Sequence, residues 1–136
     1  MIRWFNILLI CTALPVFVTG QSLRCIYEDM AIKYYQENDF LKAKAYSDST
    51  LSECPDLFDN SYVWHVRGYI MYQVFLKVDN RSTESSAREE SLEAFYRSIT
   101  LDSLKEEQVA ESKRAINQIA KTYWNDAAKA LEDTNS

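Results

Sequence analysis

Glycine and proline are so scarce in this sequence that few folds other than helical ones can be built from it. Its 136 residues include two glycines and two prolines. Most all-β folds need glycine in their turns, and collagen-like or linker proteins need far more of both residues. Hydrophobic residues make up 47% of the chain, which is enough for the core of one small domain. We therefore predict an all-α protein with a single folded domain.

Five segments repeat their apolar residues at every third or fourth position, the spacing that places them on one face of a helix. The third segment is apolar on most of its surface, so it should be the central, most buried helix. The run 78–86 is polar and without periodicity, which is typical of a loop. The last segment is expected to bend or break around Ser112. The predicted helices span 22–37, 40–53, 59–77, 87–101 and 105–131.

The first twenty residues differ in kind from the rest of the chain. Arg3 and the amino terminus give a positive start, an apolar run with Pro15 covers 7–18, and Gly20 precedes a plausible cut before Gln21. This arrangement is typical of a secretory signal peptide, and the apolar run is short for a membrane span. We predict a signal peptide at 1–20, a mature domain at 21–136 without a membrane span, and export to the periplasm or the exterior. An uncleaved membrane anchor is the alternative.

Charge and composition argue against several classes of function. The formal net charge is −5, so binding to nucleic acid through phosphate neutralisation is not expected. Residues 21–136 keep a single glycine, Gly68, and a phosphate-binding loop needs two or three. His65 is the only histidine, which leaves no usual zinc site and no supported catalytic triad. We therefore predict no catalytic residue, no metal and no cofactor, and we expect His65 on a helix surface.

The helical segments also repeat as pairs. The first pair carries Tyr27, Met30, Ala31 and Tyr34, then Ala43, Ser47, Thr50, Leu51 and Pro55; the second carries Trp64, Arg67, Gly68 and Met71, then Ser91, Phe95, Ser98 and Ile99; and Ile116, Ile119, Ala120 and Tyr123 begin a third. This pattern resembles the tetratricopeptide repeat, a helical hairpin of about 34 residues. Small residues let neighbouring helices approach closely. The second repeat departs from the pattern by an insertion of about eleven residues, and the third stops after its first helix. A generic stack of helical hairpins is the alternative.

The resemblance implies a right-handed stack of about two and a half hairpins that binds a protein or peptide partner on its concave face. Such a domain acts as an adaptor or scaffold. The alternatives are a structural or regulatory part of a longer repeat array, or a helical enzyme. Some of the rings on this face could instead pack under the final helix. The partner-binding side chains implied by the repeat register are Glu28, Ile32, Tyr35 and Gln36; His65, Tyr69, Tyr72 and Gln73; and Asn117, Lys121, Trp124 and Asn125.

Three further features concern single residues. Arg67 stands among apolar positions and should have a carboxylate partner, for which Asp29, Glu90 and Glu93 are the candidates. Cys25 and Cys54 lie at the same end of the first predicted hairpin, so they either form a disulfide or remain two buried thiols. The run 80–82 matches the N-glycosylation pattern, which has meaning only in a eukaryotic secretory route.

Overall fold

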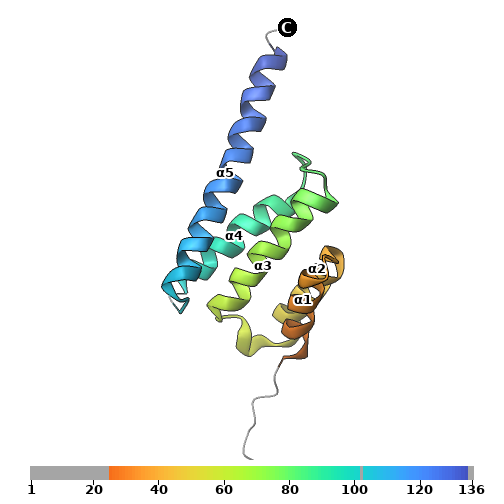
Figure 1. Ribbon diagram of the computed structural model, residues 1–136, viewed down its shortest axis with the longest axis vertical. Coiled ribbons are helices and arrows are strands. Elements are labelled where there is room, and N and C mark those ends of the chain that lie inside the picture. The colour runs from red at the N-terminus through yellow and green to blue at the C-terminus, as the bar shows by residue number, and fades with distance from the viewer. Residues whose placement is uncertain (1–24, 102, 135–136) are drawn as a thin grey trace, which may run out of the picture.

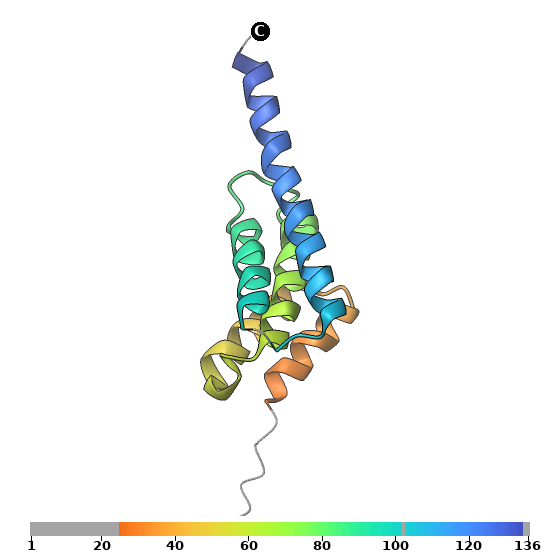
Figure 2. The same cartoon turned by 90° about the vertical axis from the view of Figure 1, so that its left-hand side faces the viewer.

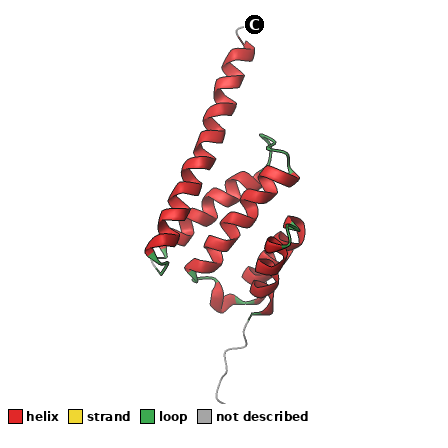
Figure 3. Cartoon of the chain, viewed as in Figure 1, coloured by secondary structure: helices red, strands yellow, loops and turns green. Residues whose placement is uncertain are grey.

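The computed structural model describes residues 25–101 and 103–134, and these residues form helices joined by short loops. The helices are α1 (Ile26–Gln36), α2 (Phe40–Glu53), α3 (Ser61–Gln73), α4 (Ser86–Thr100) and α5 (Glu106–Thr134). No strand occurs in the described ranges, as Figure 3 shows. The all-α prediction is confirmed. The predicted signal peptide at 1–20 and the predicted helix start at Ser22 lie outside the described residues.

Short turns separate the helices at the positions where the apolar periodicity fails. Asn38 takes a positive φ of 62° between α1 and α2, a conformation that asparagine tolerates better than most residues. Asp39 then caps α2, its carboxylate accepting a hydrogen bond from the backbone N–H of Lys42 at 3.2 Å. Asn60 caps α3 in the same way, accepting from two backbone N–H groups of the first turn. The turn at Asn38 and the cap at Asp39 join α1 and α2 into one hairpin, and the cap at Asn60 starts α3, the first helix of the next hairpin.

A disulfide closes the first hairpin. It joins Cys25, just before α1, to Cys54, just after α2, with an S–S distance of 2.10 Å. The sequence had left open whether these residues are bridged or are independent thiols. Because the two helices run antiparallel, the start of one and the end of the other meet at the same end of the hairpin.

Helix α3 occupies the centre of the arrangement. Figure 1 shows it between α4 and α5 on one side and α1 and α2 on the other. Eight of its residues are buried, more than in any other helix, as its apolar surface predicted. The regular helix ends at Gln73, and a π-helical turn (Val74–Val78) continues it over the stretch where a plain helix had been predicted. Asn80 of the glycosylation pattern is exposed in the loop that follows.

Helices α3 and α4 pack closely at Gly68. A β-carbon added there would lie 2.7–2.8 Å from three ring atoms of Phe95, which is fully buried. The hydroxyl of Ser91 donates a hydrogen bond to the carbonyl oxygen of Gly68 at 2.8 Å. Both contacts need the bare backbone of glycine to reach the opposite helix.

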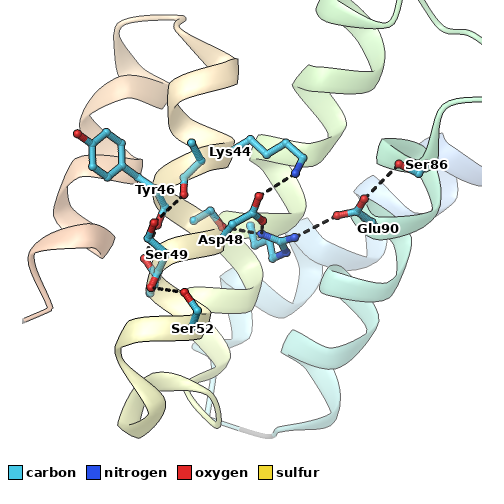
Figure 4. Close-up of polar contacts among 11 residues, drawn as sticks. Lys44, Tyr46, Asp48, Ser49, Ser52, Ser86 and Glu90 are labelled. Carbon is cyan, nitrogen blue, oxygen red and sulfur yellow. Dashed lines mark hydrogen bonds and ion pairs between the residues drawn. The ribbon is translucent and has the colours of Figure 1, made fainter.

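A buried guanidinium ties three helices together. Arg67 of α3 is 9% exposed and contacts Asp48 of α2 at 2.6 Å and Glu90 of α4 at 3.0 Å. Lys44 also pairs with Asp48, and Ser86 donates to Glu90; Figure 4 shows Asp48 and Glu90 facing each other from their helices. Glu90 is one of the three partners expected from the sequence, whereas Asp48 was not foreseen. These ion pairs fix the position of α2, in the first hairpin, relative to α3 and α4.

Helix α5 is continuous, and the predicted bend around Ser112 is wrong. The Ser112 hydroxyl is fully buried, shares a hydrogen bond of 2.8 Å with Nδ1 of His65, and lies 3.3 Å from the hydroxyl of Ser98. A buried serine with partners on neighbouring helices therefore does not interrupt the helix. Figures 1 and 2 show that the second half of α5 extends well beyond the other helices.

The packed face of α5 is the predicted one only in part: Ile116, Ile119 and Tyr123 pack around Phe95 as expected, but Ala120 does not. Its buried small residue is Ala115, whereas Ala120, expected at a helix contact, is exposed. Arg88 of α4 is 5% exposed, pairs with Asp126 and lies 3.8 Å from the centre of the Tyr123 ring. This second buried guanidinium joins α4 to the middle of α5 and was not recognised in the sequence.

Candidate functional site

A groove of about 330 Å³ lies on the face where α1, α3 and α5 meet. We call it the central groove. Its walls are mainly aromatic and amide side chains, and its volume is within the range of small ligand sites. The lining residues are Ile32, Tyr35 and Gln36 from α1; Tyr62, His65, Val66 and Tyr69 from α3; and Gln108 and Glu111 from α5.

Helical spacing explains how α3 forms the floor. Residues 62, 65, 66 and 69 follow one another at three- and four-residue steps, so their side chains share one face. Tyr62 stacks beside the His65 ring at 6.2 Å, and Tyr69 meets His65 edge-on at 5.2 Å between centroids. Tyr62 is 40% exposed, so its ring offers an accessible surface beside the groove. The floor is thus a row of aromatic rings.

His65 is a buried part of this floor, which corrects the expectation that it lies on a helix surface. Its side chain is 7% exposed, and its Nε2 atom is 3.6 Å from a carboxylate oxygen of Glu111. Burial lowers the pKa of His65 and outweighs the opposing effect of Glu111. The imidazole is therefore neutral at pH 7. The Ser112 hydroxyl on its other nitrogen is fully buried, so this serine cannot meet a substrate.

Two tyrosines of the groove, Tyr35 and Tyr69, remain protonated at physiological pH. Burial raises the pKa of Tyr35, although a hydrogen bond with the Gln73 side chain acts in the opposite direction. Burial also raises the pKa of Tyr69, and the nearby Glu111 carboxylate adds to this effect. Neutral phenols supply hydrogen bonds and ring surfaces rather than acid–base chemistry.

Two wider hollows adjoin the central groove. One, of about 850 Å³, lies at the α1–α2 turn and shares Tyr35 and Gln36 with it. The other, of about 720 Å³, lies beside the loop before α5 and shares Tyr62 and Gln108 with it. The three hollows therefore follow one another along the same face. We call this succession the track; its shape suits an extended chain better than a compact ligand.

The structure brings together about half of the predicted binding residues. Ile32, Tyr35, Gln36, His65 and Tyr69 line the central groove, and Gln73 lines the hollow beside the α1–α2 turn. Two others do not face it: Glu28 is half-buried in α1 outside the three hollows, and Tyr72 packs between the core clusters around Phe75 and Phe95. The alternative that some rings pack inside the fold thus holds for Tyr72.

The predicted residues of α5 do not lie in the groove. Asn117, Lys121, Trp124 and Asn125 are exposed and line none of the three hollows. The residues that do line it are Gln108 and Glu111, near the start of the helix. The apolar residues from which the third repeat was aligned, Ile116, Ile119 and Tyr123, pack around Phe95 of α4. Gln108 and Glu111 are three positions apart and so share one polar face of α5, and this spacing was not recognised in the sequence.

Within the described ranges, no three His, Cys, Asp or Glu side chains gather in a way that could hold a metal ion. None of the described helices combines the length and the apolar character that crossing a membrane requires. No protein-family model, curated protein or solved structure matches this chain.

Proposed function

We propose that this chain is a tetratricopeptide-like interaction module that binds an extended segment of a partner protein along the track. The observation that carries the proposal is the central groove, whose aromatic and amide walls come from α1, α3 and α5. These are the first helices of successive hairpins in the proposed repeat. Proteins of that architecture bind partners on the surface formed by one helix of each repeat.

The packing between hairpins supports the repeat interpretation. Ala31 and Gly68 occupy equivalent small positions in the two repeats and are both buried, at 3% exposure for Ala31. Larger residues fill the space beside both: Ala31 packs with Ala43 of its own hairpin and with Ile70 of α3, and Gly68 lies against Phe95 within the second hairpin. Close approach at small residues is what the repeat pattern requires.

The chemistry of the groove favours binding over catalysis. Tyrosine rings supply contact area at low entropic cost, and amides such as Gln36 and Gln108 can bond to the backbone of an extended ligand. His65 is neutral, and the serine beside it is buried. We therefore propose an adaptor or scaffold role without catalysis or cofactor.

A structural part of a longer repeat array is the second candidate. The apolar stripe of α5 continues beyond α4, where Trp124 and Leu131 are 77% and 66% exposed. A further helical element packed on this stripe would cover them. We propose export for either role, since the Cys25–Cys54 disulfide is typical of an oxidising compartment.

The test is affinity capture with matched aromatic variants. Wild-type protein, Tyr62→Ala and Tyr96→Ala would each be used to capture proteins from the exported fraction of the source cells. Tyr62 lines the groove at 40% exposure, whereas Tyr96 is 66% exposed on α4 outside the three hollows. We expect a captured protein that binds wild type and Tyr96→Ala but is lost with Tyr62→Ala.

Circular dichroism would show that all three proteins are folded. A partner that binds the folded Tyr62→Ala variant as tightly as wild type would contradict the groove as the binding site. A partner lost instead with Trp124→Ala would favour the second candidate, because this side chain lies on the extended part of α5.

A further inference from the structure

The track carries an excess of negative charge. Of the described residues, five acidic and two basic side chains line its three hollows, and in each hollow the acids outnumber the bases. The acids are Glu37 and Asp39 at one end, Glu111 in the central groove, and Asp56 and Asp59 at the other end; the bases are Lys77 and Lys105. A ligand that follows the track meets carboxylates in each hollow.

Among the residues that the structure describes, Glu111 is the only charged side chain lining the central groove. Its side chain is 36% exposed, and its ionic contact in the described ranges is with His65, whose imidazole is neutral at pH 7. No lysine or arginine nitrogen of the described residues lies within 4 Å of it. Arg114, one turn further along α5, is exposed and lines none of the hollows. The carboxylate therefore faces the groove without a cation.

Aromatic rings surround this carboxylate. Tyr62, Tyr69 and Glu111 line the same groove. The Glu111 charge raises the pKa of the Tyr69 hydroxyl, and the charge of Arg114, which does not line the groove, acts more weakly in the opposite direction. A cation is attracted both to a carboxylate and to the face of an aromatic ring. A groove that combines the two, and has no positive side chain among its described lining residues, matches a lysine or arginine side chain.

Building on the proposed function, we infer that the bound segment carries a lysine or arginine whose cation lies between Glu111 and the tyrosine rings of the central groove. The remainder of the segment extends into the two outer hollows. Glu37, Asp39 and Asp59 there already pair with Lys33, Lys42 and Arg97, so Asp56 is the outer carboxylate that favours a second basic residue. The partner is thus a basic, extended stretch of protein rather than an acidic one. The attraction is electrostatic, so binding weakens as salt concentration rises.

The test is selection from a phage library of random dodecapeptides on four immobilised proteins. These are wild type, Glu111→Gln, Glu93→Gln and Tyr62→Ala. Glu111→Gln removes the groove charge while keeping nearly the same shape. Glu93→Gln is the matched control, because it removes the same charge from an exposed position of α4 that lines none of the hollows.

We expect wild type and Glu93→Gln to enrich peptides with lysine or arginine at one fixed position between apolar or aromatic residues. The Glu111→Gln selection should lose that preference. For one enriched peptide, replacing the basic residue by glutamine should weaken binding to wild type about fivefold to tenfold, the combined effect of one partly exposed ion pair and one cation–π contact. The same replacement should weaken binding to Glu111→Gln by only about twofold to threefold, because the cation–π contact with the tyrosine rings remains.

The outcomes separate the two proposals. Enriched peptides that bind wild type better than Tyr62→Ala, but carry no preferred basic position or keep it with Glu111→Gln, overturn the inference and leave the groove as a peptide site. A basic preference that is lost equally with Glu93→Gln also overturns it, because net charge alone would then explain the selection. Absence of any enrichment over Tyr62→Ala overturns both the inference and the proposed function.

Discussion

Gly68→Ala tests whether the close approach of α3 and α4 is a real constraint of this fold. On helix propensity alone, alanine in place of a helical glycine should stabilise the protein by about 1 kcal/mol. The structure predicts the opposite sign. The added methyl group would lie 2.7 Å from the Phe95 ring, whereas ordinary contact begins at 3.4 Å. The ring would have to move by about 0.7 Å.

Phe95 has little room for such a movement. It is fully buried, packs against Ala115 and Ile119 of α5, and meets the Tyr69 ring edge-on at 4.9 Å. Overpacking of this kind costs about 1–3 kcal/mol, and a rigid ring in a dense cluster belongs at the upper end. After the gain in helix propensity, we expect a net loss of about 2 kcal/mol in the free energy of unfolding.

The assay is urea denaturation followed by circular dichroism, with wild type, Gly68→Ala, Phe95→Leu and the double variant. Phe95→Leu replaces the rigid ring, whose Cδ1, Cε1 and Cγ atoms lie nearest the new methyl group, by a smaller side chain that can turn away from it. The two changes should therefore be less than additive, and Gly68→Ala should cost much less in the Phe95→Leu background. A Gly68→Ala protein that is about 1 kcal/mol more stable than wild type would refute the packing argument.

Three other changes test the remaining supports of the fold. Cys54→Ser should lower the free energy of unfolding by about 3–4 kcal/mol under oxidising conditions, because the disulfide closes a loop with a sequence separation of 29. In a denaturation series under reducing conditions, the variant and wild type should be equally stable. Arg67→Ala should cost about 3 kcal/mol in the same assay, since it leaves Glu90 without its cation and Asp48 with Lys44 alone. Glu90→Gln should cost less, and equal costs would contradict the three-helix network. Burial lowers the pKa of His65 in the folded protein, so as pH falls below about 6.5 the unfolded chain binds a proton first and stability decreases. Thermal melts between pH 7.5 and 5 should show this decrease, and a His65→Gln variant that shows it equally would assign it to another group.

Local sequence patterns predicted the helices well. The predicted 40–53 segment coincides with α2, and the polar run 78–86 contains the loop before α4. Both depend on periodicity and on capping residues such as Asp39, which act within a few positions of the chain. The disulfide was foreseen as a possibility by the same reasoning, because an antiparallel hairpin fixes which of its ends meet.

Partners on separate helices were predicted less well. The sequence offered three carboxylates for Arg67 and omitted Asp48, which lies nineteen residues earlier on another helix. It placed His65 at the surface, although the side chain is covered by Ser112 of α5. In each case the deciding contact joins residues whose relation depends on how two helices cross.

The sequence by itself determined that this chain is helical, where most of its helices begin and end, and which faces of the first three helices are apolar. Those properties follow from local periodicity and from the scarcity of glycine and proline. Only the tertiary structure decided which part of α5 reaches the groove. The stripe around Ile119 satisfies the same spacing whether it packs on α3 or α4, and it is the burial of Phe95 and Ala115 that selects α4. That choice turns Gln108 and Glu111, rather than Lys121 and Trp124, toward the groove.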